Sequence, residues 1–132
     1  MPKTITVDKD AWAVSAGIVS GTIDFLTVGD TFLYTVPAGR RLIVTFAAVE
    51  TLSVTGFLTK ASITLGTVIP YYDIASGTEV FSDNPNTVTE IALNVGVNSI
   101  SVQGGASVYV SIVTAATATV CTGRVIMKGI LL

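Results

Sequence analysis

Hydrophobic and polar residues alternate along much of the chain, and no segment keeps a helical period. In the segment Ser107–Thr114, Val108, Val110 and Ile112 occupy every second position. Successive side chains of a strand point to opposite faces of a sheet, so these three share one face. The pattern predicts a strand with one buried face and one more open face.

The C-terminal segment Thr119–Leu131 alternates in the same way. Arg124 and Lys128 fall on one of its faces. Val125 and Met127 fall on the other. We therefore expect the two basic side chains to point outward and the two apolar ones inward.

The segment Leu42–Val49 is apolar on both faces and is interrupted only by Thr45. It is far shorter than the roughly 20 residues that a membrane helix needs. A strand that is apolar on both faces is covered on both sides, so we expect it to lie centrally, between two layers or against another chain.

Strand patterns recur at short intervals, and no segment offers a helix of ten residues or more. Such spacing is typical of a sandwich or barrel rather than of βαβ units. The fold class predicted is all-β: an antiparallel, jelly-roll-like sandwich of about 8 strands over residues 15–132, preceded by an extended N-terminal arm over residues 1–14. The predicted strands are Thr4–Val7, Ala11–Val14, Ile18–Ile23, Phe32–Val36, Arg41–Leu52, Leu58–Leu65, Val68–Ile74, Thr87–Val95, Ser99–Val102, Ser107–Thr114 and Thr119–Leu131.

Glycine, proline and asparagine mark the connections. Val36–Gly39 has proline second and glycine fourth, as a type I turn prefers. Gln103–Ala106 contains Gly-Gly and predicts a tight hairpin between two strands. Ser76–Thr87 is the longest polar connection, and we expect it to form an exposed loop.

Composition adds an expectation about assembly. The chain has 19 Val, 12 Ile and 19 Thr, but only 16 of its 132 residues are charged and its net charge is −2. A weakly charged, apolar surface suits an oligomer better than a lone monomer. The seven basic residues are scattered apart from Arg40 and Arg41, so no nucleic-acid footprint is present.

The chain has one cysteine, Cys121, which excludes an internal disulfide. It lies in an apolar alternating segment, and we expect a buried, inert thiol. The first residues, Met1–Asp8, show neither an apolar core nor a cleavage signal, so we expect no secretory peptide.

Catalytic signatures are absent from the sequence. There is no histidine, which removes Ser-His-Asp and Cys-His arrangements and the commonest metal ligand. We therefore expect no enzyme and no cofactor. Asp73, Glu79 and Asp83 lie close together in the sequence and could contribute to a calcium site, although the Asp-x-Asp-x-Asp-Gly spacing is missing.

Aromatic residues are the main candidates for partner binding. Trp12 and Val14 belong to the N-terminal arm, which could add a strand to a foreign sheet edge. Tyr71 and Tyr72 either straddle one strand or stack on a sugar ring. These four residues are the predicted partner-binding residues.

Two segments resemble small bacteriophage virion proteins. One runs from Phe32 to Val44 and places Val-Pro-Ala-Gly between two strands. The other begins at Val97 with Val-Asn-Ser-Ile-Ser-Val-Gln-Gly-Gly, continues with Val-Tyr-Val-Ser-Ile-Val and closes on Gly-Ile-Leu-Leu. The resemblance covers roughly residues 30–132. It implies a jelly-roll-like sandwich that trimerises and binds the major capsid protein or another virion protein as a decoration or cement protein.

Alternatives from other classes stay open. A carbohydrate- or receptor-binding module, such as a fibre head, would use Tyr71, Tyr72 and the Ser76–Thr87 segment. A secreted trimer of the TNF or C1q type is disfavoured because no export signal is present. The interpretation we adopt is a non-enzymatic virion protein that decorates and stabilises a capsid, with no nucleic-acid or membrane partner.

Overall fold

The computed structural model describes residues 14–81, 84–94 and 100–132 of the chain. Within these ranges all regular structure is β-strand, and no helix there has the length and apolarity to cross a membrane. The described strands number ten: β1 (Val14–Val19), β2 (Ile23–Asp24), β3 (Gly29–Thr35), β4 (Arg41–Thr55), β5 (Ala61–Gly66), β6 (Ala75–Val80), β7 (Val88–Glu90), β8 (Ile100–Gln103), β9 (Ser107–Thr114) and β10 (Val120–Leu131).

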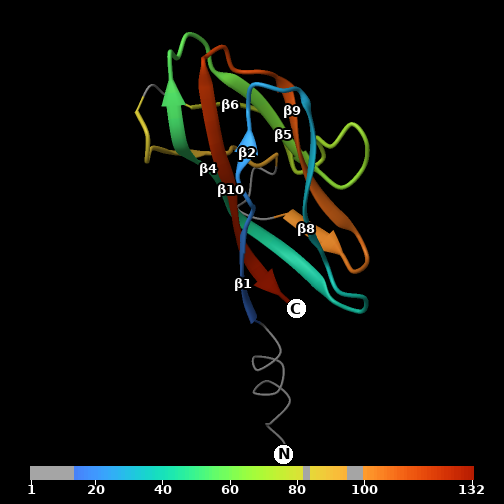
Figure 1. Ribbon diagram of the computed structural model, residues 1–132. Coiled ribbons are helices and arrows are strands. Elements are labelled where there is room, and N and C mark those ends of the chain that lie inside the picture. The colour runs from blue at the N-terminus through green and yellow to red at the C-terminus, as the bar shows by residue number, and fades with distance from the viewer. Residues whose placement is uncertain (1–13, 82–83, 95–99) are drawn as a thin grey trace, which may run out of the picture.

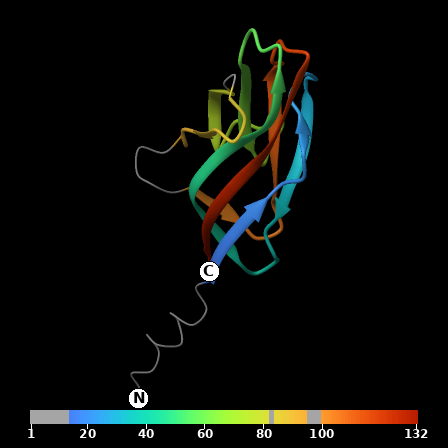
Figure 2. The same cartoon turned by 60° about the vertical axis from the view of Figure 1, so that its left-hand side comes forward.

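The strands form two antiparallel sheets that face each other (Figures 1 and 2). The six-stranded sheet has the order β1-β10-β4-β7, with β2 also beside β10 and β8 also beside β4. The four-stranded sheet has the order β3-β9-β5-β6. The predicted all-β antiparallel sandwich is confirmed.

The ten strands occupy eight positions. β1 and β2 lie one after the other along β10, and β8 and β7 lie one after the other along β4. In chain order, the first position (β1 and β2) pairs with the eighth (β10), and the second (β3) pairs with the seventh (β9). The third position (β4) pairs with the sixth (β7 and β8), and the fourth (β5) pairs with the fifth (β6). The described chain therefore runs as one long antiparallel ribbon that is folded into two layers.

The core lies between the two sheets and is built by the alternation seen in the sequence. Val108, Val110 and Ile112 of β9 are buried, and so are Val125 and Met127 of β10. Because one face of each strand points into the sandwich, burial of this face stabilises the fold by roughly 25 cal/mol per Å² of apolar surface removed from water. The predicted inward faces are confirmed.

The basic residues of β10 point outward, as predicted. Lys128 is exposed, with its Nζ 5.8 Å from the ring centroid of Phe46. Arg124 is partly exposed, and its Nε donates a 2.6 Å hydrogen bond to Glu50 Oε1. Both contacts cross from β10 to β4 on the outer face of the six-stranded sheet.

The central position predicted for Leu42–Val49 is also confirmed, because the segment belongs to β4. β4 pairs with β10 on one side and with β7 and β8 on the other. Leu42, Val44, Ala47 and Val49 are fully buried in the core.

The connection after β5 differs from the sequence prediction. Val68–Ile74, predicted as a strand, is a loop, because the Asp73 carboxylate accepts hydrogen bonds from Thr67 and closes the segment on itself. β6 instead occupies the start of the predicted loop Ser76–Thr87. β6 is an edge strand that forms by pairing with β5, and such a strand tolerates polar residues on its open face.

Two further connections are also corrected. The Arg40 N–H donates to the Pro37 oxygen at 3.1 Å, so the turn spans Pro37–Arg40 rather than Val36–Gly39. Gly39 is third in this turn with φ of 79°, which a type II turn requires. Gln103–Ala106 is a tight turn but no hairpin, because β8 and β9 belong to different sheets.

Candidate interaction surface

The structure separates the four predicted partner-binding residues. Tyr71 and Tyr72 lie together in the loop between β5 and β6 (lime green, right of Figure 1). Val14 begins β1 in the other sheet, in register with Leu131. Trp12 lies outside the described residues, as does the rest of the predicted arm.

The loop between β5 and β6 is anchored by side-chain hydrogen bonds. Asp73 Oδ1 accepts the Thr67 N–H at 2.8 Å, and Asp73 Oδ2 accepts the Thr67 hydroxyl at 2.7 Å. On its other side, Asn94 Nδ2 donates to the Tyr72 oxygen at 2.7 Å. The Asn94 N–H donates to the Ile74 oxygen at 2.9 Å. These hydrogen bonds therefore hold the loop in a defined conformation.

Both oxygens of the Asp73 carboxylate already accept hydrogen bonds within this loop. Burial by itself raises the pKa of Asp73, but the hydrogen bonds from Thr67 and Val68 outweigh it and hold the pKa below the ordinary value of 3.8. The calcium hypothesis needs these same oxygens. Glu79 lies on β6, Asp83 is outside the described residues, and the described part of the chain holds no group of three potential metal ligands.

Three aromatic rings form a row across the outer face of the four-stranded sheet. Phe32 of β3 meets Tyr109 of β9 edge to face, with ring centroids 5.8 Å apart. Tyr71 stacks on the other side of Tyr109, with centroids 4.5 Å apart and an angle of 23° between the rings. The rings come from three distant parts of the sequence.

Gly66 makes room for this stack. It is the β5 partner of Tyr109 in the sheet register. A Cβ on Gly66 would lie 2.4 Å from the Tyr71 carbonyl carbon and 2.3 Å from Asp73 Oδ1. The loop backbone thus occupies the space that a side chain at Gly66 would fill, which brings the Tyr71 ring onto Tyr109.

A carboxylate adjoins the aromatic row. Asp30 precedes Phe32 by two residues on β3, so both share the outer face. Desolvation, then Tyr109 and then Asp30 raise the pKa of Tyr71 above its usual 10.0. Within the described ranges Asp30 has no ion-pair partner. We call Asp30, Phe32, Tyr71 and Tyr109 the aromatic face.

Apolar side chains of the loop are unusually exposed. Val68 is 68% exposed, Ile69 76% and Tyr72 53%, and we call these three residues the loop tip. Phe32, on the aromatic face, is 52% exposed. A cluster of exposed apolar and aromatic side chains is typical of a surface that another molecule covers. These exposed side chains can contact a binding partner, and none of them is a nucleophile paired with a base.

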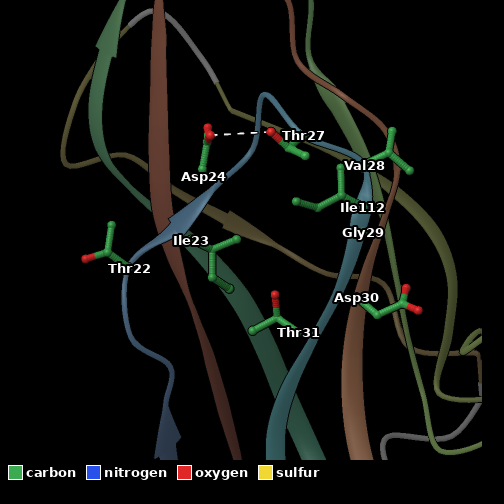
Figure 3. A pocket seen from close by; sticks show the side chains of 9 residues that line it. All are labelled: Thr22, Ile23, Asp24, Thr27, Val28, Gly29, Asp30, Thr31 and Ile112. Atoms are coloured by element: carbon green, nitrogen blue, oxygen red, sulfur yellow. Dashed lines mark hydrogen bonds between the residues drawn. The ribbon is translucent and has the colours of Figure 1, made fainter.

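A hollow of about 270 Å³ lies beside the β2–β3 connection (Figure 3). Ile23, Thr31 and Ile112 point toward one another there, whereas Asp30 points to the other side of β3. Asp24 Oδ2 accepts the Thr27 hydroxyl at 3.5 Å, a long hydrogen bond. The two carboxylates do not converge on the hollow, so it lacks the paired acids that glycoside hydrolysis requires.

Cys121 is fully buried on the inner face of β10, as predicted. Burial, with a smaller contribution from Asp24, raises the pKa of the thiol to about 11. The reactive thiolate is therefore scarce at neutral pH, and the residue acts as a small apolar side chain.

Sequence reasoning missed Phe32, Tyr109 and Asp30. A signal was present for Tyr109, because the alternation of Ser107–Thr114 places this aromatic ring on the open face of its strand. No local signal shows that Phe32 and Tyr71 meet it, because sheet pairing and loop closure decide those contacts.

The comparisons with known proteins agree with the fold. No family model and no curated protein matches the chain. A chain in the acidic stable capsid structure of Helicobacter pylori bacteriophage KHP30 aligns over 90% of this chain and 91% of its own length, with a TM-score of 0.62 and 13% identity. A chain in the capsid asymmetric unit of cyanophage Pam1 aligns over 89% and 85%, with a TM-score of 0.54 and 16% identity.

Proposed function

We propose that the protein is a non-enzymatic virion component that decorates and stabilises a bacteriophage capsid. The observation that carries this proposal is the pair of fold matches over 90% and 89% of the chain, both to chains of phage capsid structures. The coverage is nearly equal on both sides, so the matched chains are close to this chain in size.

The strand order supports the jelly-roll form of this fold. A ribbon whose positions pair first with eighth, second with seventh, third with sixth and fourth with fifth, wrapped into two sheets, is the arrangement of a jelly roll. Jelly rolls limit the exposed edges of antiparallel sheets and recur in viral capsids and in lectins.

Oligomerisation, as a homotrimer, is the second part of the proposal. The weakly charged surface and the exposed apolar side chains favour contact between copies. If each subunit buried about 1,000 Å² against its neighbours, two-thirds of it apolar, the gross gain would be roughly 16 kcal/mol. Association costs about 4–15 kcal/mol, so an interface of this size or larger is what a stable trimer would need.

The N-terminal arm, residues 1–14 with Trp12, is the third part. Its last residue, Val14, is the first residue of β1, which lies at the edge of the six-stranded sheet. A segment joined to an edge strand is well placed to add a strand to a neighbouring subunit or to the capsid lattice when it binds in an extended form.

Two measurements test the proposal. Light scattering of the purified chain gives the oligomer mass, for which a trimer is expected. Co-sedimentation with shells purified from the phage or prophage that encodes the chain tests capsid binding. Removal of residues 1–13, which spares β1 from Val14 onward, is expected to weaken binding without changing the circular dichroism spectrum. A monomer at high concentration that stays in the supernatant would refute the proposal.

A carbohydrate- or receptor-binding module is the second candidate function. The exposed ring of Tyr72 at the loop tip favours it, because exposed aromatic rings stack on sugars. Binding to a glycan array that Tyr72→Ala abolishes would support this function. An empty array would favour the structural role.

A further inference from the structure

We infer that the aromatic face and the loop tip together receive a protein segment whose lysine or arginine is flanked by apolar residues, supplied by another virion protein. The inference rests on the proposed capsid role and adds to it the chemistry of the partner. It starts from the juxtaposition of Asp30, Phe32 and Tyr71 on one sheet face.

Charge gives the first argument. The strands of the four-stranded sheet carry two acids, Asp30 and Glu79, and neither a lysine nor an arginine. Arg41, Arg124 and Lys128 all belong to strands of the other sheet. Lys60 lies one residue before β5, at the end of that strand opposite to Gly66, the partner of Tyr109. Near the aromatic rings the strands therefore carry the acid Asp30 and no base, and a cationic group of a partner would gain from Asp30 and from the neighbouring rings.

The exposed apolar area gives the second argument. The loop tip presents two exposed branched aliphatic side chains, Val68 and Ile69, and the aromatic face presents the exposed ring of Phe32. Aliphatic groups gain most from covering by other apolar side chains, which a peptide segment supplies and a sugar does not. Two of the neighbouring polar groups, Asp73 and Asn94, already hold the loop, which leaves Asp30 as the carboxylate open to a partner. A protein partner is therefore favoured over a glycan.

Preorganisation gives the third argument. Hydrogen bonds from Thr67 and Asn94 fix both ends of the loop before any partner arrives. The stack of Tyr71 on Tyr109 fixes its middle. A surface that needs no further ordering loses less conformational entropy when it binds.

The same charges argue against pairing of this face with itself. Two copies packed face to face would bring two Asp30 carboxylates together, and buried like charges oppose association. Face-to-face pairing of two copies is thus disfavoured, and the oligomer mass of the variants distinguishes another virion component from a different face of a neighbouring copy.

The experiment measures binding of full-length variants to shells purified from the phage or prophage that encodes the chain. Asp30→Asn, Phe32→Ser and Ile69→Ser change the proposed surface. Val88→Ser and Glu90→Gln are matched controls, because both residues are exposed on β7 of the opposite sheet. We expect a loss of at least about tenfold in affinity for each of the first three variants and less than about twofold for the controls.

Salt and oligomer mass complete the test. Raising sodium chloride from 0.05 to 0.5 M should weaken wild-type binding more than binding of Asp30→Asn, because that variant lacks the charge contact. Light scattering should show the same mass for all variants. If Phe32→Ser proves unstable, binding of Asp30→Asn and Ile69→Ser still tests the inference, because both variants replace exposed side chains and should fold normally.

The outcomes separate the inference from the proposed function. Wild-type binding that all three surface variants retain would overturn the inference and leave the capsid role intact. Failure of the wild-type chain to bind would overturn both. A variant that falls apart to monomers would assign the face to contacts between copies, and glycan binding lost in Phe32→Ser would assign it to a sugar. Both results would overturn the inference.

Discussion

Gly66→Ala isolates the contact that positions the loop between β5 and β6. An added Cβ would lie 2.3 Å from Asp73 Oδ1 and 2.4 and 2.5 Å from two Tyr71 backbone carbons. Ordinary carbon contacts begin near 3.4 Å. The loop backbone would have to retreat by about 1 Å, because backbone atoms have no alternative rotamer.

The cost follows from the interactions that the retreating loop gives up. The two hydrogen bonds from Thr67 to Asp73 contribute about 0.5–1.5 kcal/mol each, toward the low end because the carboxylate is exposed. The stack of Tyr71 on Tyr109 contributes about 0.5–1.5 kcal/mol. We expect the free energy of unfolding to fall by about 2–3 kcal/mol, which lowers the melting temperature by roughly 6–12 °C.

Urea denaturation followed by far-ultraviolet circular dichroism measures this change, and near-ultraviolet dichroism reports the tyrosine stack. Gly17→Ala is the matched control, because Gly17 lies in β1 with no heavy atom within 4 Å of an added Cβ. The control should stay within about 1 kcal/mol of the wild type. If Gly66→Ala were as stable as Gly17→Ala and kept the near-ultraviolet tyrosine signal, Gly66 would not be the residue that makes room for the loop and the Tyr71 ring.

Three further predictions concern the core, the loop and the thiol. Thr51→Val should raise the free energy of unfolding by about 1 kcal/mol in urea titrations, because the buried Thr51 hydroxyl has no hydrogen-bond partner among the described residues; a destabilised variant would show that the hydroxyl is bonded. The stability advantage of the wild type over Asp73→Asn should be full at pH 7 and shrink below about pH 4. The folded pKa of Asp73 lies below 3.8, so the unfolded chain binds the proton first as the pH falls; an advantage equal at pH 3 and pH 7 would contradict this. Cys121, with its pKa raised to about 11, should resist a disulfide reagent at pH 8 until urea unfolds the chain, and rapid labelling of the native protein would argue against its burial.

Much of the fold is predictable from local pattern. The alternation of β9 and β10 assigns each side chain to the inner or outer face, and the structure confirms it for Val110, Val125 and Lys128. The same pattern predicts two layers without helices. Such features depend on a two-residue period within a single strand, so the sequence of that strand contains them.

The interaction surface was only partly predictable. The sequence by itself determined that Tyr71 and Tyr72 are aromatic candidates and that Tyr109 lies on an open strand face. Tertiary structure decided that Val68–Ile74 is a loop and that β6 follows it, because pairing with β5 and closure by Asp73 join residues that no local period relates. The contacts among Phe32, Tyr71 and Tyr109 likewise depend on strand register, and register is fixed by the whole sandwich rather than by any one segment.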